Sequence, residues 1–240
     1  MVASLLFFAG FERETGNPDT PVTPPSGNGL FTVSKDGHQI RFALGNLVYD
    51  GINGYRFAAH QYDYGGDFGW GTGSNPTLTS TDREDYPTFD DWGNYIAGGW
   101  RTLTAREWEF LLFIRAYARD RRGAATVCGV HGMVLLPDNF SGGTFQAGFD
   151  HYHDWSSNVY DASSWAAMEA AGAVFLPAAG CRYGTRLGNV GTCGCYWSST
   201  PNIEYMYFFY NNDRDYGVSV GDYFVIRRVG GLSVRLVQDY

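Results

Sequence analysis

Apolar residues recur at helical intervals in two stretches of the chain. In the first, Thr104 and Glu107 have the spacing of a capping box, in which each side chain satisfies a free backbone amide of the other residue. Trp108 and Leu111 follow on one helical face. We therefore predict a helix over residues 104–117.

The second helical stretch covers residues 161–171. Trp165 and Met168 lie three residues apart, and Gly172 follows as a natural helix terminator. This spacing predicts a second helix over these residues.

Short runs rich in β-branched and aromatic residues predict strands. The eight runs are 31–33, 39–42, 133–136, 173–176, 205–210, 217–220, 223–226 and 233–237. An Asn- and Asp-rich segment, 211–215, separates two of them and predicts a hairpin turn. Two helices and eight short strands indicate a loop-rich α+β domain.

The run 205–210 carries large side chains on both of its faces. Tyr205, Tyr207 and Phe209 alternate with Met206, Phe208 and Tyr210. Such a strand is either buried on both faces or presents its rings to a partner.

Composition excludes several classes of protein. The 240 residues are 44% hydrophobic, 17% aromatic and 18% charged, which excludes a disordered chain, a collagen and a coiled coil. The net charge of −8 and the scattered basic residues, of which only Lys35 is a lysine, argue against a nucleic-acid partner. Uncharged rings must therefore cover much of the surface, and tyrosine-rich surfaces often bind ligands.

The chain divides into three parts. Residues 1–11 are apolar but too short to span a membrane, and they read either as the remnant of a signal or lipoprotein segment or as a short strand. Phe11 stands where a lipid-bearing cysteine would be. Residues 12–29 form a proline-rich linker, and residues 30–240 form one globular domain.

Metal-type ligands concentrate at one place. His151 and His153, flanked by Asp150 and Asp154, would share a face only in extended backbone, and no third ligand follows at a defining spacing. We interpret this segment as a polar surface loop and predict no metal site.

The four cysteines allow two disulfides in three pairings. A bridge between Cys193 and Cys195 would be strained, a bridge between Cys128 and Cys181 is conceivable, and free thiols are favoured over both. No Cys-x-x-Cys, nucleophile elbow, phosphate loop or dinucleotide fingerprint occurs. The sequence therefore predicts no catalytic residue and no cofactor.

Five blocks in a fixed order carry a resemblance to a known family. They are 99–108 (GWRTLTAREW), 135–138 (LLPD), 173–180 (AVFLPAAG), 196–200 (YWSST) and 231–237 (GLSVRLV). The chain resembles the C-type-lectin-fold domains of gut Bacteroidetes and phage surface proteins, including Fibrobacter-succinogenes-major-domain proteins and the variable proteins of diversity-generating retroelements. This resemblance implies a C-type lectin fold of the formylglycine-generating-enzyme-like subtype.

In the retroelement family, error-prone copying at template adenines replaces a segment that corresponds to residues 201–232. Eight of the 27 residues from 203 to 229 are aromatic, and most residue types in the segment are reachable from asparagine codons. The resemblance thus implies a hypervariable, aromatic-rich binding face. Its expected ligand-binding residues are Ile203, Tyr205, Met206, Phe208, Tyr210, Asp213, Asp215, Tyr216, Asp222, Tyr223, Phe224, Arg227, Val229 and Leu232.

Two differences between this sequence and those of related proteins disfavour particular functions. The tripeptides that hold calcium in sugar-binding members are absent, which disfavours calcium-dependent sugar binding. Sulfatase-modifier relatives use a cysteine pair near the C-terminus, whereas no cysteine follows Cys195 here. A cysteine-dependent oxidase using Cys193 and Cys195 is therefore a weaker alternative, and a non-diversifying adhesin or pilus-tip protein is another.

The resemblance implies that the chain is a non-enzymatic, extracellular protein on a bacterial surface or a phage virion. Its expected partner is a protein or glycan on a cell surface, with no nucleic acid and no membrane span. Four tryptophans of the scaffold are expected core anchors: Trp100, Trp108, Trp165 and Trp197. Arg235 is expected to pair with a carboxylate.

Overall fold

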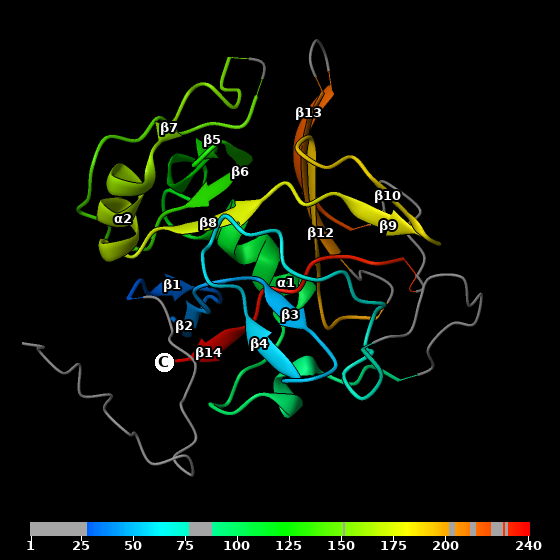
Figure 1. The fold of residues 1–240 in the computed structure, drawn as a ribbon. Helices are drawn as coiled ribbons and strands as arrows, with labels where there is room; N and C mark the ends of the chain where they lie inside the picture. The colour runs from blue at the N-terminus through cyan, green and yellow to red at the C-terminus, as the bar shows by residue number, and fades with distance from the viewer. Residues whose placement is uncertain are drawn as a thin grey trace, which may run out of the picture.

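The computed structural model of the chain describes residues 28–76, 88–150, 152–201, 205–211, 215–221, 228 and 230–240. Within these residues, fourteen short strands combine with two α-helices (Figure 1). The strands pair antiparallel except where β5 meets β7. The α+β class is thus confirmed, with more strands than the eight predicted runs. Residues 1–11, most of the linker 12–29 and the predicted strand 223–226 lie outside the described residues.

The strands form five small sheets. Their orders are β7-β5-β6-β8, β11-β12-β13 and β1-β2-β14, and the pairs β3-β4 and β9-β10 form separate hairpins. The bounds are β1 Phe31–Thr32, β2 Gln39–Phe42, β3 Leu47–Tyr49, β4 Tyr55–Phe57, β5 Arg122–Val127, β6 Val130–Leu135, β7 Val159–Tyr160, β8 Val174–Pro177, β9 Cys181–Tyr183, β10 Arg186–Gly188, β11 Cys193–Trp197, β12 Tyr205–Asn211, β13 Asp215–Val220 and β14 Val237–Asp239.

The predicted strand 233–237 is wrong in its position. Ser233 makes an isolated bridge with Tyr196, and regular pairing begins only at Val237. The residues between them pass through the interior, where carbonyls of this segment accept hydrogen bonds from Ala43 and Leu47. The segment therefore connects several elements instead of joining one sheet.

The first predicted helix is α1, Ala105–Glu109, and it continues as a π-helical segment, Phe110–Ile114. The capping box is confirmed, because Thr104 accepts from the Glu107 amide and Glu107 accepts from the Thr104 amide at 2.7 Å. The helix ends before residue 117, as Arg115 leaves helical geometry and its buried guanidinium donates back to the Leu111 carbonyl.

The second predicted helix is α2, Ala162–Ala170. Asp161 caps it by accepting from the Ser164 amide at 2.8 Å. Gly172 ends it with φ of +90°, a conformation that favours glycine. Both ends of this prediction are confirmed. Shorter helical turns occur at Trp92–Tyr95 and Arg119–Arg121.

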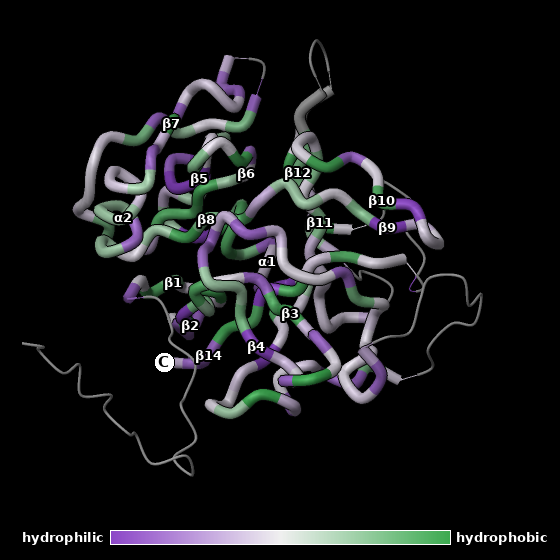
Figure 2. The backbone as a smooth tube through the Cα atoms, in the orientation of Figure 1, coloured by the Kyte–Doolittle hydropathy of each residue, from purple (hydrophilic) through white to green (hydrophobic). Residues whose placement is uncertain are grey.

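Three buried clusters make up the interior. The first core is centred on Trp108, the second on Trp100 and Trp197, and the third on Trp165. These four predicted anchors are confirmed, since each is 4% exposed or less. Figure 2 shows hydrophobic chain along β6, β8 and β12, in the interior of the molecule.

A buried arginine connects separate segments of the fold. Arg235 is 1% exposed, and its Nη2 donates to Gln61 Oε1 at 2.7 Å and to the Phe175 carbonyl at 2.9 Å. Its Nη1 donates to Asn46 Oδ1 at 3.2 Å. The expected carboxylate partner is wrong: the described acceptors are amide and carbonyl oxygens, and Gln61 Nε2 continues the network to Glu169. Burial lowers the pKa of Arg235 to about 10, so the group stays charged at neutral pH.

Replacing Arg235 with methionine keeps an unbranched apolar stem but removes the donor to Asn46 and Phe175. Because each unsatisfied buried acceptor costs about 1–3 kcal/mol, we expect Arg235→Met to lower the free energy of unfolding by about 2–4 kcal/mol in a urea titration. Arg186→Met, an exposed change on β10, should alter it by less than about 0.5 kcal/mol. Equal losses in the two variants would contradict the role of this network.

Candidate functional site

The expected binding segment, 201–232, contains β12 and β13. β12 pairs antiparallel with β11, which places Phe208 opposite Gly194. A Cβ at Gly194 would lie 2.2 Å from Phe208 Cζ, so the ring occupies the space that any side chain at position 194 would need. On its other edge β12 pairs with β13 as far as Asn211 and Asp215, which confirms the predicted hairpin.

Residues 205–208 of β12 are buried on both faces of the strand. Tyr205 and Tyr207 pack into the second core, whereas Met206 and Phe208 pack into the first core. Each of these four side chains is 2% exposed or less. Of the two alternatives that its sequence left open, the strand buried on both faces is the one observed.

Four of the expected ligand-binding residues therefore need correction. Tyr205, Met206, Phe208 and Leu232 are each 0% exposed, because their side chains fill the first and second cores. Their placement on an exposed binding face is wrong.

The other expected site residues divide into two groups. For Tyr210, Asp215 and Tyr216 the structure describes the backbone alone, at the far end of the β12-β13 hairpin. The remaining ones lie outside the described residues: Ile203, Asp213, Asp222, Tyr223, Phe224, Arg227 and Val229.

Both ends of the stretch 222–227 are held by the scaffold. Before it, the Gly221 amide donates to the Tyr205 carbonyl at 3.1 Å. After it, the Arg228 carbonyl accepts from the Trp70 amide at 2.8 Å, and the Arg228 guanidinium lies 4.4 Å from the centre of the Trp70 ring. Trp70 is buried, so this anchor is part of the second core.

A second pair of anchors follows at residues 231 and 232. Leu232 exchanges two backbone hydrogen bonds of 3.0 Å with Phe68, and Gly231 exchanges two with Arg182. A Cβ at Gly231 would lie 2.9 Å from Arg182 Cβ and 3.0 Å from Asp67 Cβ. Arg182 Nη2 lies 2.7 Å from Asp67 Oδ2 in an ion pair. Burial raises the pKa of Asp67, and the Arg182 guanidinium opposes this rise.

Sequence reasoning did not find Trp70, Arg228, Asp67 or Arg182 as parts of this site. Trp70 and Asp67 lie more than 100 residues before the segment that they anchor, and neither belongs to one of the five blocks. Their roles follow from tertiary contacts, for which spacing along the chain gives no signal.

Three thiols lie close together in the second core. Cys193 Sγ and Cys195 Sγ lie 3.3 Å apart, and the Cys195 thiol is hydrogen-bonded to Cys181. All three are buried, Cys128 is exposed, and all four cysteines are free, as favoured from the sequence. Hydrogen bonds from Cys195, Tyr183 and Asn189 lower the pKa of Cys181 to about 7, against the opposing effect of burial. The pKa of the donor Cys195 is raised.

The histidine-rich segment contains a hydrogen bond between His153 and Asp150. His153 Nδ1 lies 2.8 Å from Asp150 Oδ1, and His151 is outside the described residues. Within the described part of the chain, no cluster of three or more histidine, cysteine or acidic side chains has a metal-binding arrangement.

Comparison of the chain with protein-family models, with curated proteins and with solved structures found no match. Among the described helices, none has the length and apolar character needed to cross a bilayer.

Gly194→Ala should destabilise the fold, because the added methyl group overlaps the Phe208 ring in a fully packed strand. We expect a loss of about 1–3 kcal/mol in the free energy of unfolding, measured in urea. Phe208→Leu in the same chain should restore part of it. Gly188→Ala is the matched control, since a Cβ there meets no atom within 4 Å. A loss at Gly188 as large as at Gly194 would refute this packing argument.

The thiol cluster predicts a pH dependence of stability. Cys181 ionises near pH 7 in the folded chain and near its ordinary value of 9.0 when unfolded. Between these values the unfolded chain binds more protons, so this group adds stability as pH rises from 7 to 9 and loses it as pH falls through 7. Urea titrations should show the stability difference between the native chain and Cys181→Ser growing across this window, with Cys128→Ser as the exposed control. Parallel curves for the native chain and Cys181→Ser would contradict the assignment.

Proposed function

We propose that the chain is a non-enzymatic ligand-binding protein, a display scaffold of C-type lectin fold with a hypervariable segment. It acts outside the cell, on a bacterial surface or a phage virion, and attaches to a protein or glycan on another surface. The ordered blocks of the sequence, which bracket residues 201–232, support this proposal.

One structural observation carries the proposal: the residues on either side of 222–227 are fixed to buried elements of the scaffold. Gly221 is held by β12, and Arg228 is held by Trp70 of the second core. A segment whose ends are fixed by backbone bonds can change its side chains without moving the framework. Hypervariable binding surfaces need this separation of framework and contact residues.

Because residues 205–208 of β12 are buried, we assign the proposed contacts to other residues of the segment 201–232. Side chains that fill two cores cannot vary freely without loss of stability. The proposed face therefore consists of the ten expected residues other than the four buried ones: Ile203, Tyr210, Asp213, Asp215, Tyr216, Asp222, Tyr223, Phe224, Arg227 and Val229.

The close approach of Cys193 and Cys195 is the observation that favours a cysteine-dependent oxidase as a second candidate. Both thiols are 5% exposed or less, so a substrate could not reach them without a rearrangement of β11. Oxygen consumption with thiol peptides, lost in Cys193→Ser and Cys195→Ser, would favour this candidate over the display function.

Sequencing of the genomic locus tests the display function. We expect a near-repeat of the segment coding for 201–232, differing only at template adenines, beside a reverse-transcriptase gene. Sequence variants should differ at codons 203, 210, 213, 215, 216, 222–224, 227 and 229 and should spare codons 205–208 and 232, whose side chains are core. A locus without the repeat and the reverse transcriptase would leave an ordinary, non-diversifying adhesin.

A further inference from the structure

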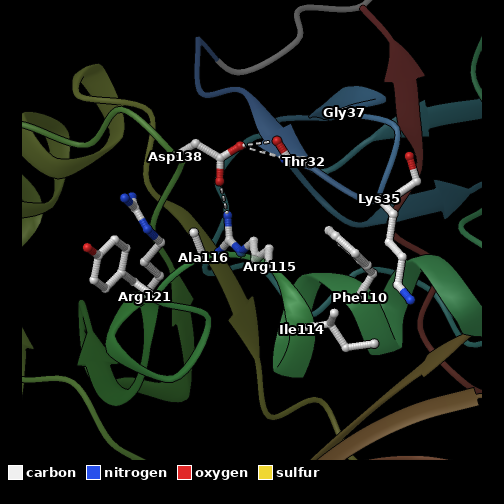
Figure 3. Close-up of a pocket in the computed structure, with 11 residues that line it drawn as sticks. Thr32, Lys35, Gly37, Phe110, Ile114, Arg115, Ala116, Arg121 and Asp138 are labelled. Atoms are coloured by element: carbon white, nitrogen blue, oxygen red, sulfur yellow. Dashed lines mark hydrogen bonds and ion pairs between the residues drawn. The ribbon is translucent and has the colours of Figure 1, made fainter.

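A pocket of about 380 Å³ lies between β1, the π-helical segment and the turn that follows it (Figure 3). None of its lining residues comes from 201–232. Its volume is within the range of about 300–1,000 Å³ typical of small-molecule sites.

Three cationic side chains, Lys35, Arg115 and Arg121, and one carboxylate, Asp138, line this pocket. Arg115 is buried and donates to Asp138 Oδ1 at 2.9 Å, while Asp138 Oδ2 accepts from the Thr32 amide and hydroxyl. The charge of Asp138 is therefore compensated within the protein.

Two positive charges are left over. In the described residues, neither Lys35 nor Arg121 has a carboxylate partner; Arg121 donates to the Pro137 carbonyl, and its Nε is buried without a partner. Figure 3 shows Lys35 and Arg121 at opposite ends of the pocket, with the Arg115–Asp138 pair between them. In a chain of net charge −8, two uncompensated cations at one pocket indicate an anionic ligand.

The pocket offers apolar contact at the end that holds Lys35. Phe110 and Ile114 lie beside Lys35, and Ile114 is 49% exposed. Tyr117, which is 70% exposed, holds its ring 5.9 Å from the Arg121 guanidinium and has φ of +58°. A non-glycine residue in this left-handed conformation is uncommon and clusters at functional sites.

We propose that this pocket binds a small aliphatic dicarboxylate, with one carboxylate on Lys35, the other on Arg121 and the carbon chain against Phe110 and Ile114. A carboxylate matches the single charge at each end, whereas a phosphate group carries a charge of about −1.5 to −2. The site is independent of the proposed display function, since it shares no residue with the hypervariable segment.

Nuclear magnetic resonance titration of the full chain with glutarate, adipate and pimelate tests the proposal, with hexanoate as the single-charge probe. We expect saturable shifts at the pocket residues for at least one dicarboxylate, with a Kd at least about tenfold lower than that of hexanoate. Lys35→Gln and Arg121→Gln should each raise that Kd at least about tenfold, whereas Arg186→Gln, an exposed cation on β10, should leave it unchanged.

Three results would overturn the proposal: no saturable shift with any dicarboxylate, equal binding of hexanoate, or an unchanged Kd in Lys35→Gln. Lys35 is exposed and makes no ion pair in the described residues, so its replacement leaves the fold intact. If Arg121→Gln unfolds through loss of its bond to Pro137, the Lys35→Gln result decides alone.

Discussion

The burial of β12 on both faces is the constraint on which the rest of the structure depends. Its alternate side chains complete two different cores, and Gly194 on β11 must lack a side chain so that Phe208 can lie across it. Residues 205–208 of this strand cannot serve as a contact surface. The binding face that we propose for the segment 201–232 must therefore lie outside these residues.

Backbone and polar contacts between distant segments connect the scaffold. The described residues form short strands in five small sheets, so no single sheet holds them together. Arg235 joins the C-terminal segment to Asn46, Gln61 and β8 through its buried guanidinium. Trp70 and Phe68 hold the chain on the C-terminal side of 222–227. These contacts stabilise the framework on either side of residues 222–227.

The sequence predicted what local chemistry determines. The caps at Thr104 and Asp161, the Gly172 terminator and the hairpin after β12 all follow from side chains within a few residues. It did not predict β5, because glycine and alanine, which make up residues 123–125, give little strand signal. The chain packed against Gly123 leaves no room for a side chain at that position. Nor could it decide which rings of 205–210 are buried, since both faces are apolar and only tertiary packing distinguishes core from surface.

In the proposed display function, residues 205–208 are framework and residues 222–227 tolerate variation. Two display libraries, one randomised at 222–227 and the other at 205–208, test this division when the fraction of protease-resistant clones is measured in each. We expect most clones of the first library to stay folded and few clones of the second to do so. Equal folded fractions in the two libraries would contradict it.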